Sequence, residues 1–218
     1  MTDDYTQELA LSLADAADPT VRHLWQALLL DGPQQCAMLC EGASGLWASQ
    51  LVALDAWAVA AAYDLFRTPL LEDDGFWALV RNVRRWSLVL EAAAVHAAMV
   101  PVPPRAGPQT TTLEDLAHWD HTQVARADQL YGGSWRSRGG VGAYMVGIRK
   151  WDRLQTPLAY LKTASLNTAL GHPVAGPSVW DDLVDLRRYL LLWEGERLRS
   201  TGCWLASSTT TLSQEDSV

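Results

Sequence analysis

Signals that start and end α-helices recur along this chain, and no stretch shows the alternating pattern of a β-strand. Asp18 and Pro19 supply an N-cap and a first helical residue, and apolar residues then repeat at helical spacing as far as Leu30. Further helices are expected at Ser44 to about Phe66, Phe76 to Met99 after Asp74, Thr112 to about Tyr131, about Val141 to Leu154, Pro157 to Leu170, and Ser178 to about Arg199. The sequence therefore predicts an all-α, multi-helix bundle.

The balance of apolar and charged residues indicates how these helices pack. Apolar residues make up 49% of the 218 residues and charged residues 19%, so many helices must be apolar on more than one face. Such helices pack in several layers or across a subunit boundary, and we expect a homo-oligomer. The most hydrophobic stretch, Leu46 to Tyr63, contains Ser49, Gln50 and Asp55, so we interpret it as a buried helix and expect no membrane span.

The formal charge of −8 and the isoelectric point near 5.0 argue against a protein that wraps duplex nucleic acid, because neutralising phosphates requires a basic face. A single small nucleotide, bound by a local group of basic residues, stays possible. The N-terminus lacks a basic segment followed by an apolar core, and Cys36, Cys40 and Cys203 are interpreted as reduced core thiols. These features predict a cytoplasmic protein, in the host cytoplasm if a phage encodes it.

Four prolines between Val100 and Pro108 mark the clearest boundary in the chain, since proline cannot continue a helix. We expect a helical N-terminal portion at 1–100, a proline-rich linker at 101–111, a functional helical domain at 112–200 and a disordered polar tail at 201–218.

Three acidic residues begin the last expected helix. Asp182 and Asp185 are three residues apart, so their carboxylates lie on one helical face, where they can share Mg²⁺ or Mn²⁺; Asp181 precedes them. The alternative is that these acids only offset the helix dipole at an N-terminus.

A charged stripe on the preceding long helix offers a second candidate. Arg149, Asp152 and Arg153 lie on one face, where the arginines suit phosphate and Asp152 suits a metal; a solvated row of ion pairs is the alternative. The glycine-rich connection before this helix, with Arg138, can approach an anion or form a plain turn. Trp135 and Trp151 lie near these residues and can stack on a base.

Glu114, His118 and His121 also share one helical face. Two imidazoles and a carboxylate can ligate a transition metal, but histidines at this spacing are usually incidental. We therefore treat metal binding here as the lesser interpretation.

Three runs together resemble a known family: Tyr131 to Tyr144, Arg149 to Leu154, and Asp181 to Leu192. They resemble small phage and prophage proteins of the nucleotide-modification-associated type, which are distantly similar to the all-α nucleoside triphosphate pyrophosphohydrolases of the MazG and dUTPase group. The resemblance covers Leu113 to Arg199 and implies a MazG-like helical core in the C-terminal half. In that family, acids on two helices hold Mg²⁺ against the triphosphate.

The resemblance implies that Asp152, Asp182 and Asp185 hold Mg²⁺ or Mn²⁺ and act in catalysis. Four basic residues would then contact phosphate: Arg138, Arg149, Lys150 and Arg153. The expected function is a metal-dependent (deoxy)nucleoside triphosphate pyrophosphohydrolase. Only Asp152 is acidic in the counterpart of the earlier motif, so the alternative is a non-catalytic nucleotide-binding or assembly module.

The spacing also predicts a specific geometry. Asp182 and Asp185 should face Asp152 across a groove between two antiparallel helices, with Arg149 or Lys150 at its rim. Carboxylates brought together repel one another, so a metal ion or a basic side chain must lie among them.

Overall fold

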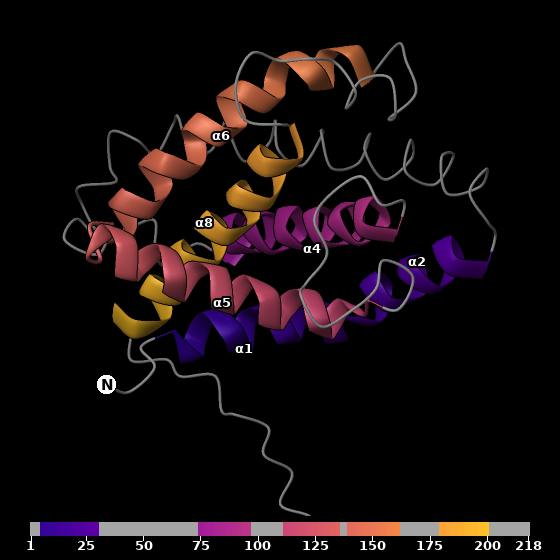
Figure 1. The fold of residues 1–218 in the computed structure, drawn as a ribbon, viewed down its shortest axis with the longest axis horizontal. Coiled ribbons are helices and arrows are strands. Elements are labelled where there is room, and N and C mark those ends of the chain that lie inside the picture. The colour runs from indigo at the N-terminus through magenta and orange to yellow at the C-terminus, as the bar shows by residue number, and fades with distance from the viewer. Residues whose placement is uncertain (1–4, 31–73, 97–110, 136–138, 162–178, 201–218) are drawn as a thin grey trace, which may run out of the picture.

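The computed structural model describes residues 5–30, 74–96, 111–135, 139–161 and 179–200, and within these ranges the chain is helical and contains no strand. The helices are α1 (Thr6–Ala17), α2 (Pro19–Leu30), α4 (Asp74–His96), α5 (Leu113–Tyr131), α6 (Gly139–Leu161) and α8 (Val179–Ser200), as Figure 1 shows. The predicted all-α bundle is therefore confirmed.

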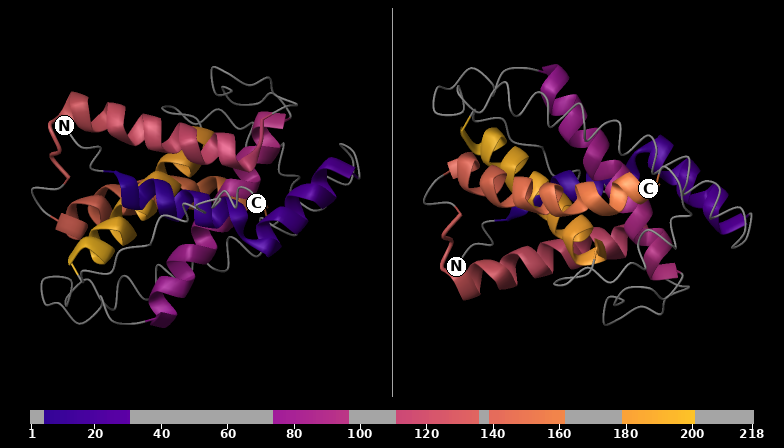
Figure 2. Two further views of the ribbon diagram at one scale, coloured as in Figure 1. Left: turned by 90° about the horizontal axis from the view of Figure 1, so that it is seen from below. Right: turned by 90° about the horizontal axis from the view of Figure 1, so that it is seen from above.

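Helix α8 lies at the centre of the bundle. It packs most extensively along α6 and also contacts α4 and α1, while α5 packs chiefly against α1 (Figure 1). Figure 2 shows α4 running at a steep angle to α5 and α6 in both of its views. Helices from both sides of residues 101–111 therefore share one bundle.

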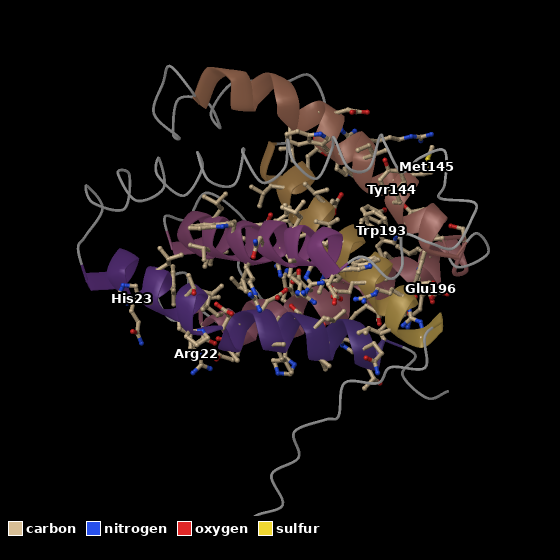
Figure 3. All side chains as sticks on the ribbon, turned by 180° about the vertical axis from the view of Figure 1, so that it is seen from behind. Arg22, His23, Tyr144, Met145, Trp193 and Glu196 are labelled. Atoms are coloured by element: carbon tan, nitrogen blue, oxygen red, sulfur yellow. The ribbon has the colours of Figure 1, made fainter. Side chains whose placement is uncertain are left out.

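The hydrophobic core confirms that the two portions pack together. Trp77 of α4, Tyr144 of α6 and Trp193 of α8 form its aromatic centre, with Trp193 5.4 Å from Trp77 and 4.9 Å from Tyr144 between ring centroids. Figure 3 shows Tyr144 and Trp193 directed toward each other, while the neighbouring Met145 lies at the outer side of α6. Burying such large rings stabilises the contact between α4, α6 and α8.

Local sequence signals fix both ends of α5. The Thr112 side chain accepts a hydrogen bond from the Asp115 backbone N–H at 3.1 Å, and Asp115 Oδ2 accepts one from the Thr112 N–H at 2.9 Å. This arrangement is a capping box, and it begins the helix at Thr112, where the sequence predicts its start. At the other end Gly132 has a φ of 58°, a left-handed conformation that glycine adopts without strain.

Three helices differ from the sequence-based expectation. Helix α1 was not predicted, because its face toward the protein carries Gln7, Glu8, Ser12 and Asp15, which do not form an apolar stripe. Helix α4 begins at Asp74 itself. Helix α6 begins at Gly139 and continues through Pro157 to Leu161 without the predicted break; a proline removes one hydrogen bond and need not end a helix that neighbouring helices support.

Several predictions concern residues outside the described ranges. These are the helix from Ser44 to Phe66 with its apolar stretch, the proline-rich segment, the rest of the helix expected at Pro157 to Leu170, the three cysteines and the C-terminal tail. Among the described helices, none is long and apolar enough to cross a membrane.

A buried layer of charged side chains joins α1, α4 and α8. Arg84 of α4 donates Nε to Asp15 Oδ2 of α1 at 2.8 Å and Nη1 to Glu194 of α8, and all three side chains are almost fully buried. The two carboxylates raise the pKa of Arg84 further above its usual value despite its burial, so the guanidinium stays charged. Figure 3 shows nitrogen and oxygen atoms gathered in the space between α4 and α1.

A second buried guanidinium continues this layer. Arg187 of α8 contacts Glu91 of α4 and Asp120 of α5, and these three side chains are also almost fully buried. The layer thus links four helices through two arginines. Such buried charges are stable only when they are paired, so the layer restricts how these helices can be arranged.

Candidate functional site

An ion-pair cluster joins α6 to α8 where the sequence predicted a site. Lys150 Nζ lies 2.6 Å from Asp185 Oδ2 and 3.4 Å from Asp182 Oδ1, and Arg153 Nη2 lies 2.6 Å from Asp182 Oδ1. The predicted pairing of the two helices is therefore present, with a basic residue between the two acids. The spacing of three residues on α8 puts both carboxylates within reach of the same lysine.

Arg188 extends the cluster to α5. Its Nε lies 3.0 Å from Asp120 Oδ1, and its Nη1 lies 3.6 Å from Asp185 Oδ1. The Asp185 carboxylate is thus held between Lys150 and Arg188, and its side chain is still 35% exposed.

The predicted three-acid metal site does not form among these residues. Asp152 is exposed on α6, whereas Asp182 is buried against Lys150 and Arg153. In the part of the chain that the structure describes, no three His, Cys, Asp or Glu residues come together in a way that could hold a metal ion. The donor set therefore does not fit a metal held by Asp152, Asp182 and Asp185 together.

A cavity of about 850 Å³ opens beside the cluster, between α5, α6 and α8. This volume lies within the range of about 300–1,000 Å³ that is usual for small-molecule sites. Its wall is formed by Gln123, Val124, Arg126, Ala127, Asp128, Leu130, Tyr131, Ser134, Trp135, Gly142, Val146, Lys150, Asp185, Arg188, Tyr189 and Leu192. The three sequence runs that carried the family resemblance each contribute to this wall.

The cavity wall combines positive charge with aromatic rings. Arg126, Lys150 and Arg188 each come from a different helix and outnumber the two acids, Asp128 and Asp185. Aromatic rings are supplied by Tyr131, which is 72% exposed, and by Trp135 and Tyr189. Burial, and secondarily the negative charge of Asp185, raises the pKa of Tyr189, so its hydroxyl stays protonated and can donate a hydrogen bond.

The segment 131–135 reaches this wall because of glycine. A side chain at position 142 would collide with the Trp135 backbone, so the chain packs closely on the first turns of α6 only with Gly142 there. The Trp135 ring contacts the Tyr5 ring, with 6.3 Å between centroids, and the Arg199 guanidinium, 5.9 Å from its centroid. In the structure Gly142 therefore allows the segment 131–135 to pack on α6, whereas the sequence left open an anion contact or a plain turn for this glycine-rich connection.

The remaining predicted residues lie apart from the cavity wall. Arg149 is exposed on α6, Arg153 is exposed and pairs with Asp182, and Trp151 is buried in the hydrophobic core. Of the residues predicted to stack on a base, Trp135 lines the cavity. Of the described residues predicted to bind phosphate, Lys150 lines it. Arg138 lies outside the described residues.

The candidate transition-metal site on α5 is not assembled either. Glu114 forms an exposed ion pair with Arg22 of α2 at 2.7 Å, and His118 is exposed. Together with His121 they do not form a metal-binding group among the described residues.

Sequence reasoning missed four basic or aromatic residues among those described in the wall: Arg126, Tyr131, Arg188 and Tyr189. Arg188 and Tyr189 lie three and four residues after Asp185 on α8, so helical spacing predicts that both share a face with Asp185. Arg126 could not be found in this way, because it depends on how α5 lies relative to α6.

Comparison with protein-family models, curated proteins and solved structures finds no match for this chain.

Proposed function

We propose that this protein binds a nucleotide in the cavity between α5, α6 and α8. The observation that carries the proposal is the convergence of three basic side chains from three helices on one nucleotide-sized cavity that also has aromatic walls. Phosphate groups require positive charge, and bases stack on aromatic faces.

The overall charge of the chain makes this local arrangement informative. The chain carries a formal charge of −8, yet the described residues of the cavity wall include one more basic than acidic residue. A wall with this balance is more favourable to a small anion than the acidic protein as a whole is. Polar groups suited to orienting a sugar and base are also present, among them Gln123 and Ser134.

Lys150 and Arg126 have different parts in this proposal. Lys150 is half-buried and already oriented by Asp182 and Asp185, so it supplies a fixed positive charge at the inner wall. Arg126 is exposed and supplies a second charge from α5. Trp135 and Tyr131 offer aromatic faces for the base.

The second candidate is metal-dependent hydrolysis of a (deoxy)nucleoside triphosphate. Its support is Asp185, a partly exposed carboxylate on the cavity wall three residues from Asp182, together with the resemblance of the three sequence runs. Magnesium commonly binds through one or two carboxylates and the substrate phosphates, so it would arrive with the nucleotide.

The direct test is equilibrium binding of a panel of nucleotides, measured by calorimetry with the full chain, with and without Mg²⁺. Arg126→Gln and Lys150→Gln should each weaken binding about tenfold, the effect of losing about 1.4 kcal/mol of interaction. Arg149→Gln is the matched control, because it removes the same charge from an exposed residue of α6 outside the wall, and it should leave affinity unchanged.

The outcomes separate the candidates. Absence of binding for every nucleotide, or equal weakening by Arg149→Gln and Arg126→Gln, would overturn the cavity as the binding site. Release of pyrophosphate, orthophosphate or monophosphate from a triphosphate only when Mg²⁺ or Mn²⁺ is present would establish the second candidate.

A further inference from the structure

We propose that the cavity selects nucleotides that carry a single negative charge, such as cyclic mononucleotides, and that Asp185 sets this preference. The inference rests on the nucleotide-binding function proposed above and names the chemical class of the ligand.

The first argument is the formal charge of the wall. Among the described residues of the wall, three basic side chains face two acids, an excess of one positive charge. Among the described residues that form ion pairs with or beside the wall, Arg153 and Arg187 are outnumbered by Glu91, Asp120 and Asp182, so these neighbours cancel the excess and the site favours the ligand with the smallest negative charge. A triphosphate would bring several uncompensated charges into a partly buried site, which is unfavourable.

The second argument is the position of the Asp185 carboxylate. Its Oδ2 lies 2.6 Å from Lys150 Nζ and its Oδ1 lies 3.6 Å from Arg188 Nη1, and all three residues line the cavity. A carboxylate held between two basic groups occupies the place that a phosphate oxygen would take. A ligand phosphate must therefore share Lys150 and Arg188 with Asp185, and the repulsion between the two anions grows with the charge of the ligand.

The third argument is that Lys150 and Arg188 each form a further ion pair besides the one with Asp185. Lys150 contacts Asp182, and Arg188 contacts Asp120, so neither can turn freely to follow a flexible polyphosphate chain. A compact phosphodiester places its single charge at one fixed point. Arg126, exposed on α5, is then left to contact the remaining polar groups of the ligand.

The test compares ligands that share a base and differ in charge. Binding of 3′,5′-cyclic AMP, AMP and ATP, and of the corresponding guanine and pyrimidine series, is measured with the full chain at low and at physiological salt, without and then with Mg²⁺. We expect the wild-type protein to bind the cyclic nucleotide at least about tenfold more tightly than the triphosphate of the same base, a difference of about 1.4 kcal/mol. This ratio should shrink as salt is added, since screening weakens the repulsion.

Asp185→Asn is the decisive variant, because it removes one negative charge at nearly constant shape. It raises the excess of basic residues on the wall from one to two, so AMP and ATP should gain affinity relative to the cyclic nucleotide by about tenfold. Asp152→Asn is the matched control: it removes an exposed carboxylate from α6 outside the wall and should leave the ratio unchanged. Arg126→Gln reduces the excess of basic residues on the wall to zero and should weaken binding of the cyclic nucleotide. This variant tests the inference independently if Asp185→Asn does not fold.

Tighter binding of ATP than of the cyclic nucleotide by the wild-type protein would overturn the inference while leaving nucleotide binding intact. The same holds if Asp185→Asn weakens every ligand equally. Magnesium-dependent binding of ATP that Asp185→Asn abolishes would overturn it in favour of hydrolysis, and absence of all nucleotide binding would reject the proposed function itself.

Discussion

Arg84 on α4 donates its Nε to Asp15 Oδ2 on α1 at 2.8 Å, in the buried middle of the bundle. The residues are 69 positions apart in the chain, so this contact depends on the tertiary arrangement. Because Arg84 also contacts Glu194 of α8, one guanidinium joins three helices.

We predict that Arg84→Met destabilises the protein by about 3–5 kcal/mol, because it leaves Asp15 and Glu194 buried without their main partner. Urea unfolding followed by circular dichroism measures the change. The control is Arg22→Gln, which breaks the exposed ion pair with Glu114 and should cost no more than about 1 kcal/mol. Similar losses for both variants would contradict the importance assigned to the buried layer.

A close contact between α1 and α8 predicts the effect of a small substitution. A Cβ at position 195 would collide with the Glu8 carboxylate, which Arg199 holds through two contacts of 2.7 and 3.1 Å. Gly195→Ala should therefore destabilise by about 1–3 kcal/mol, even though alanine favours a helix over glycine. In a Glu8→Ala background the same change should become neutral or stabilising by up to about 1 kcal/mol. A thermal unfolding cycle over the four proteins tests this, and additive effects would argue against the contact.

The burial of the Tyr5 hydroxyl predicts that the stability of the protein depends on pH. Burial, and next the neighbouring Asp128 carboxylate, raises the pKa of the Tyr5 hydroxyl well above its usual value of 10. The unfolded chain therefore loses this proton at lower pH than the folded protein does, so the stabilisation by Tyr5 is complete below pH 10 and is lost as the pH rises above it. The stability advantage of the wild type over Tyr5→Phe should be constant below pH 10 and shrink above it, as measured by urea unfolding. A constant difference across pH 10 would show that the hydroxyl titrates normally.

The capping box of α5 gives a prediction that follows from the local sequence alone. Thr112→Ala removes the side-chain acceptor for the Asp115 N–H and should cost about 1 kcal/mol of unfolding free energy. Thr112→Ser keeps the hydroxyl and should retain most of the stability. Equal losses in the two variants would mean that the methyl group of Thr112, and not its hydroxyl, stabilises this end of the helix.

The sequence by itself determined the helical class and much of the local structure. Caps and glycines act over a few residues, so Thr112, Asp115 and Gly132 could be assigned from their neighbours. The pairing of α6 with α8, and a basic residue between Asp182 and Asp185, also followed from spacing, because helical geometry places residues three apart on one face.

Only the tertiary structure determined which charged side chains form ion pairs. The sequence does not predict helix α1, because its buried face is polar. That face is stable in the protein interior because Arg84 of α4 and Arg199 of α8 form ion pairs with its carboxylates. The cavity likewise required α5 to bring Arg126 opposite Lys150, a relationship between residues distant in the chain. Local periodicity specifies the direction in which a side chain points around its own helix, whereas the residue that it contacts depends on how all the helices pack. For this reason Asp152 lies exposed, while Asp182 is buried among basic side chains.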